Sequence, residues 1–368
     1  MPYGWILLYL LWCLAALLLI YGHGRRYALL ARGLRQAFDP PGPPAPPVSL
    51  LICARNEASH LEAHLPLWLE QLHPEFELIV VNDGSTDATG EVLARWAARD
   101  SRLRPVPHLA EGPGKKGALA AGIAAASYPH LVLTDADCRP LSRHWLAEMG
   151  AAFGQKRLVL GYGRLTGKGL LGGLVAFETV QTAFQYWAAA QAGQAYMGVG
   201  RNMAYHRSVY EAAGGFAKHA DLASGDDDLL LTGSQRPVAA AIMSRQTAFT
   251  TSEGPATWRA WWRQKARHYS TGWRYTPGRR YRLAAEGALQ LYFYAALPVA
   301  LLVGPWWIVL ALLAWRLSYA YGMMAWVRHL QGSARFWYAF PFWEALWAGA
   351  TSLQHLVRLL GWRPRRWR

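Results

Sequence analysis

The chain has 368 residues, enough for one large domain or two ordinary ones, and its composition is apolar, with 53% hydrophobic and 17% charged residues. The formal net charge of +15 would suit a nucleic-acid-binding protein, but the arginines cluster beside apolar segments and tryptophans, so we expect a lipid bilayer and no nucleic acid as a partner. None of the three cysteines forms a CxxC pair, which argues against a disulfide framework and a zinc site.

The first predicted element is a transmembrane helix over residues 1–24. Residues 5–21 carry no charge and are just long enough to cross a bilayer. A signal peptide fits poorly, because no basic residue precedes the apolar run and no small-residue cleavage site follows it. Basic residues between His23 and Arg35 place the following domain in the cytoplasm by the positive-inside rule. Residues 25–47 are predicted to be a basic, proline-rich linker.

Residues 48–282 are predicted to form an α/β domain. Apolar strands are expected over 48–53, 77–81, 103–106 and 131–134, and helices over 58–71, 86–98 and 116–126. Strands and helices that alternate at this spacing indicate a mainly parallel sheet covered on both faces.

Carboxylates follow two of these strands. Asp83 comes after the strand over 77–81, and Asp135 and Asp137 come after the strand over 131–134. Ligands of open α/β sheets collect at the carboxyl ends of the strands, and period-two alternation puts Asp135 and Asp137 on one side of the chain. Oxygen ligands of this kind suit Mg²⁺ or Mn²⁺, which would also hold a diphosphate. Glu57 and Asp83 could accept hydrogen bonds from uracil or ribose, although simple turn formation explains residues 82–84 equally well.

Two further charged clusters lie downstream. Lys115 and Lys116 follow glycines at a predicted helix start, where they could meet phosphate or be ordinary surface lysines. Asp226, Asp227 and Asp228 are adjacent carboxylates, for which a solvated loop or a helix N-terminus is the simple explanation. One of them, held near a cation and an acceptor hydroxyl, would be a general base.

The C-terminal half is apolar and aromatic. Residues 170–196 are predicted to be a helix that packs in the core or, less commonly, lies at the membrane surface. The region 283–368 is predicted to contain two transmembrane helices, over 284–303 and 305–327, hinged at Gly304 and Pro305. Arg316 lies near the middle of the second helix and is a functional candidate by default. Residues 336–357 are expected to be interfacial or re-entrant, because a third crossing would export the basic tail.

Several motifs resemble those of family 2 of the glycosyltransferases and follow one another in that family's order. The resemblance covers roughly residues 48–270 and depends on the following segments: 48–87 with Ala54-Arg55-Asn56-Glu57 and Asn82-Asp83-Gly84, Gly114 to Leu119, Thr134-Asp135-Ala136-Asp137, Gly200 to Phe216, and Asp226 to Leu229. Gln264 to His268 is similar to the QxxRW motif of the membrane-bound, synthase-like branch, which includes cellulose, chitin and hyaluronan synthases.

The resemblance implies a GT-A (Rossmann-like) fold and a metal-dependent, inverting hexosyltransferase that uses a nucleotide sugar, first of all a UDP-sugar. It implies that the catalytic base is Asp226, or Asp227 if the motif is shifted by one residue. The resemblance also implies uridine binding by Glu57 and Asp83, phosphate binding by Lys115, ribose or metal binding by Asp135, and Mg²⁺ or Mn²⁺ binding by Asp137. Asn202, in the acceptor-side segment, is implied to bind substrate, and Gln264 and Arg267 to contact the diphosphate and the acceptor.

The chain departs from the family pattern at two places. Gly225 stands where the base motif has a glutamate if Asp226 is the base, and His268 replaces the tryptophan of QxxRW, which puts long-chain processivity in doubt. We therefore expect a multi-pass protein of the inner or plasma membrane that transfers sugar to a glycan or lipid acceptor at the cytoplasmic face. The alternatives are single-sugar transfer to a lipid such as a polyprenyl phosphate, nucleotidyl transfer, or a non-catalytic assembly role. The donor sugar, the acceptor and any protein partners stay open.

Overall fold

The computed structural model describes residues 3–36, 44–108, 114–154, 156–222, 224–232, 238–333 and 335–359. Part of the predicted linker, the turn at Gly112 and Pro113, and the basic tail lie outside the described residues. The chain divides into two compact units. The sheet unit contains Arg32–Thr166 and Gln185–Ala256, and the helical unit contains Met1–Ala31, Gly167–Phe184 and Thr257–Pro364.

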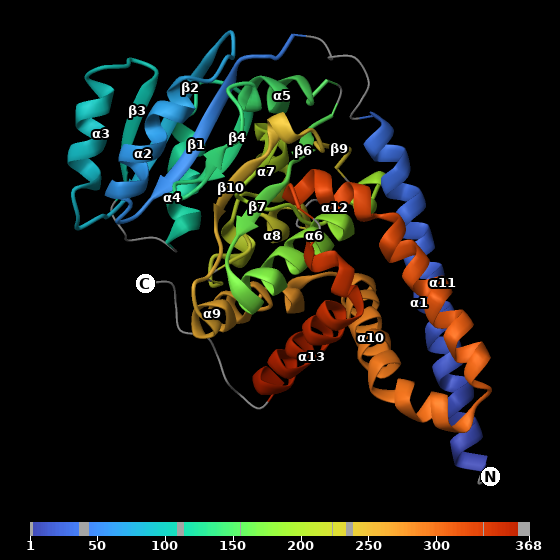
Figure 1. Ribbon diagram of the computed structural model, residues 1–368. Coiled ribbons are helices and arrows are strands. Elements are labelled where there is room, and N and C mark those ends of the chain that lie inside the picture. The colour runs from blue at the N-terminus through green and yellow to red at the C-terminus, as the bar shows by residue number, and fades with distance from the viewer. Residues whose placement is uncertain are drawn as a thin grey trace. The chain divides into compact units, whose positions relative to one another are not determined.

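The sheet unit is built on a seven-stranded, mainly parallel sheet, which confirms the predicted α/β class (Figure 1). The strand order is β3-β2-β1-β4-β8-β6-β9. Strands β1 to β4 run parallel, β8 is antiparallel to β4 and to β6, and β9 is parallel to β6. The bounds are β1 Val48–Ala54, β2 Phe76–Asp83, β3 Leu103–His108, β4 His130–Asp135, β6 Leu158–Leu160, β8 Met203–His206 and β9 Ala240–Ile242. A second sheet has the order β5-β10-β7, with β5 Arg139–Pro140, β7 Gly163–Thr166 and β10 Thr250–Glu253.

Helices cover both faces of the central strands because those strands are apolar on both sides. Leu50 and Ile52 of β1 share a buried cluster with Leu61, Leu65 and Trp145 from the helices of one face. The opposite face receives α4, where a side chain on Gly122 would collide with Val81 of β2. The helices of this unit are α2 Ala58–Leu69, α3 Thr89–Ala97, α4 Lys115–Ala125, α5 Trp145–Ala151, α7 Arg207–Ala213, η1 Ala217–His219, α8 Asp228–Thr232 and η2 Gln246–Ala248.

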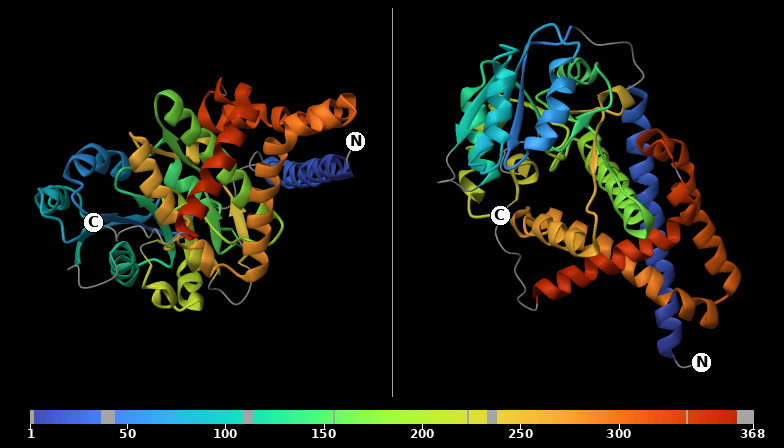
Figure 2. Two further views of the ribbon diagram at one scale, coloured as in Figure 1. Left: turned by 90° about the horizontal axis from the view of Figure 1, so that it is seen from below. Right: turned by 60° about the vertical axis from the view of Figure 1, so that its left-hand side comes forward.

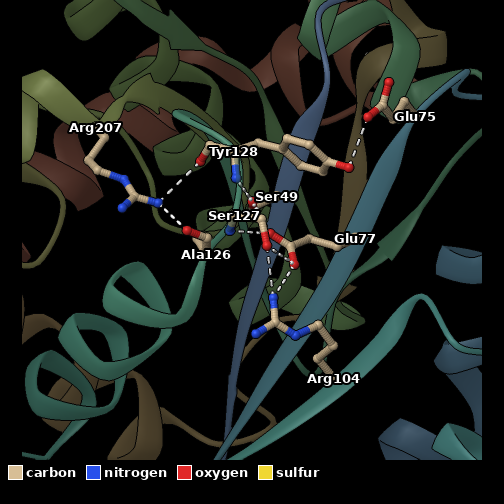
Figure 3. A network of polar contacts seen from close by, with 8 residues as sticks. All are labelled: Ser49, Glu75, Glu77, Arg104, Ala126, Ser127, Tyr128 and Arg207. Atoms are coloured by element: carbon tan, nitrogen blue, oxygen red, sulfur yellow. Dashed lines mark hydrogen bonds and ion pairs between the residues drawn. The ribbon is translucent and has the colours of Figure 1, made fainter.

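A polar network holds the amino-terminal ends of β1, β2 and β3 together (Figure 3). The buried carboxylate of Glu77 on β2 accepts hydrogen bonds from the Ser49 hydroxyl at 2.6 Å, from Ser127, and from Arg104 of β3. Burial alone would raise the pKa of Glu77, but these hydrogen bonds outweigh it and lower the pKa. The Glu77 carboxylate is therefore charged and has a structural role. It connects the amino-terminal ends of the strands, at the opposite end of the sheet from Asp135.

Replacing Glu77 with glutamine should destabilise the sheet unit. The amide can satisfy only part of this set of donors, and lost hydrogen bonds to a charged group cost about 1–3 kcal/mol. The expected result is a lower midpoint of thermal unfolding in detergent. Glu70→Gln is the matched control, since the Glu70 side chain is largely exposed and its contact with Arg143 is long, at 3.9 Å. Equal midpoints for the two variants would contradict the structural role of Glu77.

The helical unit contains several long helices (Figure 2). Some of them are strongly apolar. The bounds are α1 Tyr3–Gln36, α6 Gly169–Gln191, α9 Trp258–His268, η3 Gly272–Arg274, α10 Pro277–Val303, α11 Trp306–Gly322, α12 Met324–Gln331, η4 Arg335–Ala339 and α13 Phe340–Leu359, with α1 and α6 continuing into the sheet unit. Within the described residues, three helical stretches are long and apolar enough to cross a membrane: Tyr3–Gly33, Pro277–Val303 and Trp306–Gln331. Leu7, Leu10 and Leu14 on α1 are exposed, as side chains facing lipid would be.

Three details differ from or refine the sequence expectations. The linker predicted to start at residue 25 is helical up to Gln36, because the alanines, leucines and arginines after Gly24 favour helix. The hinge at Gly304 and Pro305 is present, since α10 ends at Val303 and α11 begins at Trp306. The aromatic side chains of α6 are buried, which favours core packing over a membrane-surface helix.

Arg316 is buried against protein. Its guanidinium forms an ion pair with Glu344 of α13 and donates a hydrogen bond to the Tyr294 hydroxyl of α10 at 3.0 Å. Glu344 also accepts a hydrogen bond from Tyr294 at 2.6 Å, and its other oxygen lies 3.8 Å from His23 of α1. The charge at the middle of α11 is thus neutralised by a carboxylate on another helix, which gives Arg316 a structural explanation.

Candidate functional site

The predicted carboxylates lie at one edge of the sheet. Strands β2, β1 and β4 are neighbours and run parallel, so their carboxyl ends meet. In this register Cys53 is paired with Asp135, and Ala54 is paired with Asn82, the residue before Asp83. The sequence-based placement at the carboxyl ends of two strands is therefore what the structure shows, with β1 between them.

Asp83 is buried and has one free acceptor. Its side chain is 2% exposed and its Oδ1 lies 2.8 Å from His108 Nδ1 at the end of β3. Oδ2 is buried and has no hydrogen-bond partner among the described residues. An unsatisfied buried carboxylate oxygen is costly, so a ligand N–H or O–H at this point would be stabilising. His108 could not be identified from the sequence, because only the pairing of β2 with β3 brings it to Asp83.

Hydrogen bonds from the loop after β2 hold the loop that carries Glu57 in place. Asn56 has a φ of 57°, a conformation rarely adopted by residues other than glycine, and its Oδ1 accepts the Thr86 backbone N–H at 2.8 Å. The Asn56 N–H donates in turn to the Ser85 hydroxyl at 2.9 Å. Glu57 itself lies 2.6 Å from His60, one turn along α2, and its side chain is about a quarter exposed, at 28%. It is accessible to a ligand beside Asp83's strand.

Asp135 and Asp137 are brought together by a turn. The Cys138 N–H donates to the Asp135 carbonyl at 3.0 Å, and ligand atoms of Asp135, Asp137 and Cys138 all lie within 4.8 Å of one another. Burial, and then the charge of Asp135, raise the pKa of Asp137. Two carboxylates held this close in a half-buried site repel each other unless a cation joins them, and oxygen donors suit Mg²⁺ or Mn²⁺. The residues present therefore fit a divalent cation.

Lys115 connects this pair to the second acidic cluster. Its Nζ lies 2.6 Å from Asp135 Oδ1 and 3.2 Å from Asp226 Oδ2. Burial alone would lower the pKa of Lys115, but the two carboxylates outweigh it and raise the pKa well above its usual range. Lys115 thus forms ion pairs with one carboxylate of each acidic cluster. Lys116 is different: its buried Nζ donates to the carbonyls of His219 at 2.6 Å and Leu222 at 3.2 Å.

The two candidate bases have opposite electrostatic environments. Burial raises the pKa of Asp226, but Lys115 outweighs this effect, so its pKa is lowered overall. Burial, then the charges of Asp226 and Asp228, raise the pKa of Asp227 to about 7. Asp227 Oδ2 accepts the Gly200 backbone N–H at 3.2 Å. No role of its own was predicted for Gly200. In the structure, a Cβ on Gly200 would lie 3.4 Å from Lys115 Nζ and 3.6 Å from Asp226 Oδ2, so this glycine lines the acidic cluster.

Asn202 is not available to a substrate. Its side chain is fully buried, and its amide nitrogen donates to the carbonyls of Tyr162 at 3.0 Å and Ala248 at 2.8 Å. Its carbonyl oxygen accepts the Trp145 indole N–H at 3.1 Å. The predicted substrate contact is therefore corrected to a structural role, in which the amide joins three segments that frame the site.

Gln264 and Arg267 lie on α9 in the helical unit. Lys265 between them pairs with Glu178 of α6 at 2.8 Å, and the Trp261 indole donates to the same carboxylate at 3.2 Å. Gln264 Oε1 is buried without a hydrogen-bond partner in the described part of the chain. Their contact with diphosphate or acceptor stays a prediction from the motif.

Comparison with known proteins supports the inferred family. Residues 49–212 match the model of glycosyl transferase family 2. The probable glycosyltransferase YdaM of Bacillus subtilis (strain 168) is 30% identical over 240 residues, which are 60% of this chain and 54% of that protein. A poly-beta-1,6-N-acetyl-D-glucosamine synthase of Staphylococcus epidermidis is 33% identical over 90 residues, 24% of this chain and 21% of that protein. The chain thus spans about half, or less, of the length of these curated relatives.

Among solved structures, the mannosyltransferase PcManGT from Pyrobaculum calidifontis, in complex with GDP-Man and Mn²⁺, is similar with a TM-score of 0.56 and 22% identity. The similarity covers 94% of this chain and 99% of that one. At this identity the likeness shows the fold, which is GT-A.

Proposed function

We propose that this chain, whose residues 49–212 belong to glycosyltransferase family 2, transfers a sugar from a nucleoside diphosphate to an acceptor hydroxyl with inversion at the anomeric carbon. The observation that carries the proposal is the lysine bridge. Lys115 forms ion pairs with Asp135 and with Asp226. Asp135 is one of the two carboxylates suited to a divalent cation, and Asp226 is adjacent to Asp227, whose pKa suits a general base. The components of one displacement reaction therefore lie within one cluster.

The donor base would bind at Asp83. The free Oδ2 of Asp83 offers an acceptor for a ring N–H, and uracil N3–H is such a donor. Glu57, on the neighbouring loop, would accept from the base or ribose. The family resemblance makes a UDP-sugar the first candidate. Guanine N1–H would suit the same oxygen, and the solved mannosyltransferase held GDP-Man, so GDP-sugars belong in the same screen.

Asp135 and Asp137 would hold the divalent cation. A bound Mg²⁺ or Mn²⁺ supplies positive charge for the diphosphate of the departing nucleotide. Lys115, which keeps Asp135 in place, adds a second positive charge at the same edge of the sheet. For Gln264 and Arg267, contact with the diphosphate or the acceptor is proposed from the sequence motif alone.

Asp227 is the preferred general base. A base works best when its pKa lies near the working pH, and Asp227 meets this condition, whereas Asp226 is stabilised as a carboxylate by Lys115. In the reaction, the acceptor hydroxyl gives its proton to Asp227, its oxygen forms a bond to C1, and the C1–O bond to the nucleoside diphosphate breaks. Attack from the face opposite the leaving group inverts C1.

The synthase-like branch and its cytoplasmic setting are part of the proposal. Similarity to a poly-N-acetylglucosamine synthase supports polysaccharide synthesis by an inner- or plasma-membrane protein, and the three apolar helical stretches support membrane association. His268 in place of the motif's tryptophan favours the second candidate, transfer of a single sugar to a lipid acceptor.

The test is a donor screen. Purified protein in detergent is incubated with a panel of UDP- and GDP-sugars and Mn²⁺, then with membrane lipid extracts, and the released nucleotide is measured. We expect release of a nucleoside diphosphate. Release of pyrophosphate would instead identify a nucleotidyltransferase, and no release with any donor would favour a non-catalytic assembly protein.

Removal of divalent cations should lower turnover at least about tenfold, because the cation supplies several kcal/mol of charge stabilisation in such sites. Nucleotide release is measured in excess EDTA and again after Mn²⁺ or Mg²⁺ is restored in excess. Recovery by either ion, but not by added monovalent salt, is the expected pattern. Undiminished turnover in EDTA would remove the cation from the mechanism.

A further inference from the structure

Backbone hydrogen bonds hold Arg201 close to both acidic clusters, the one with Asp135 and Asp137 and the one with Asp226 to Asp228. Its carbonyl accepts hydrogen bonds from the hydroxyls of Thr134 and Thr250, both at 2.9 Å. Thr134 directly precedes Asp135, and the N–H of Gly200 is bonded to Asp227. The residue after it, Asn202, is locked in the core. The start of the Arg201 side chain is therefore fixed beside both clusters.

The Arg201 side chain has no acidic partner in the described part of the chain. Its Nη2 donates to the Gly163 carbonyl at a long 3.4 Å, and its Nε is buried with no hydrogen-bond partner there. The two lysines are engaged, since Lys115 pairs with Asp135 and Asp226, and Lys116 donates to backbone carbonyls. Arg201 is thus a cation with unused hydrogen-bonding capacity in a site rich in carboxylates.

Room for this arginine depends on a glycine. A Cβ on Gly163 would lie 2.9 Å from the Arg201 Cβ and 3.1 Å from its Nε, so a larger residue there would displace the side chain. An arginine whose backbone is held beside Thr134, the residue before Asp135, is well suited to an anionic oxygen group, because its planar guanidinium matches the geometry of carboxylates and phosphates.

We propose that Arg201 binds oxygens of the donor's second phosphate, the one that is bonded to the sugar. The inference depends on the proposed function and adds a residue that the sequence reasoning passed over. A planar guanidinium can donate two hydrogen bonds to a phosphate, and Nε and one Nη are the pair that bidentate contacts use. As the bond between C1 and the diphosphate breaks, negative charge grows on the leaving phosphate, which a fixed cation stabilises. A carboxylate or phosphate on the sugar or acceptor is the other possible source of such an anion.

Nucleotide binding separates these sources. Calorimetric titrations with Mn²⁺ compare UDP with UMP, and GDP with GMP, for the wild-type protein, Arg201→Met and Arg201→Lys. Loss of hydrogen bonds to a charged group should weaken diphosphate binding by Arg201→Met about 10- to 100-fold. Monophosphate binding should change by less than about threefold, and Arg201→Lys should be intermediate because lysine keeps the charge without the planar fork.

Arg157→Met is the matched control. Arg157 is exposed, and its carbonyl accepts the His206 N–H at the end of the sheet away from Asp135. The substitution therefore removes the same charge as Arg201→Met, but far from the proposed site. This variant should bind UDP as the wild type does, and thermal unfolding should show that all variants are folded.

Three outcomes would overturn the inference. If Arg201→Met binds the diphosphates as tightly as the wild type, the inference is wrong but the proposed function is unaffected. The same holds if the only change is a higher KM for the acceptor. Equal weakening of UDP and UMP would mean that Arg201 shapes the site instead of contacting the second phosphate. A wild-type protein that binds none of the four nucleotides would overturn the proposed function and this inference together.

Discussion

Asp227→Asn should lower turnover by about 10²- to 10⁴-fold while nucleotide binding is retained, because the change removes a general base and leaves the donor contacts in place. The measurement is nucleotide release at saturating donor, with UDP affinity determined in parallel. Asparagine keeps the size of the side chain and a carbonyl oxygen that can accept the Gly200 N–H, so the loop should keep its shape. Near-normal turnover would transfer the base role to Asp226.

The pH dependence distinguishes the two carboxylates further. Since a base acts in its deprotonated form, kcat/KM of the wild-type protein should rise with pH through about 7 and level off above it. The charge of Asp226 is the second cause of the raised pKa of Asp227, after burial, so Asp226→Asn should shift this rise to lower pH. A rise that stays at the same pH in Asp226→Asn would argue against Asp227 as the titrating group.

Glu344→Leu should destabilise the helical unit by about 3–5 kcal/mol, the usual effect of leaving one member of a buried ion pair without its partner. Arg316 is fully buried, its guanidinium lies 4.5 Å from the Phe293 ring, and Glu344 is its carboxylate partner. The expected result is a sharply lower yield of folded protein and a lower midpoint of thermal unfolding in detergent.

The double variant Arg316→Leu with Glu344→Leu is the decisive control. Apolar residues of similar volume often replace a buried ion pair at no loss of stability, so the double variant should recover most of the stability that the single variant loses. Recovery identifies the pair as structural. A double variant that is stable but has lost turnover would instead give the pair a part in activity.

Local patterns were sufficient to predict the four parallel strands β1 to β4, whereas β6, β8 and β9 of the same sheet have only three or four residues each and were not predicted. The apolar runs at 48–53 and 77–81 correspond to β1 and β2, and the carboxylates that follow them lie at one edge, because parallel neighbours end together. The position of Asp135 and Asp137 also followed from the strand pattern. These features depend on residues close in sequence.

Contacts between distant residues could not be predicted. Asn202 belongs to a motif associated with the site, but its side chain is buried in the core. Nothing near it in the sequence identifies Trp145, Tyr162 and Ala248 as its hydrogen-bond partners. For Lys115 the sequence left phosphate binding and an ordinary surface position open, and it could not show the ion pairs with carboxylates 20 and 111 positions away. The choice between Asp226 and Asp227 likewise depends on burial and on Lys115, neither of which a motif reports.

The most direct test of the account is to locate Mn²⁺ by anomalous diffraction in crystals of the protein grown with the nucleoside diphosphate that the donor screen selects. The account predicts one Mn²⁺ bound by Asp135 and Asp137 with the base of the nucleotide at Asp83. A manganese ion and nucleotide bound elsewhere, with Asp135 and Asp137 contacting neither, would contradict it.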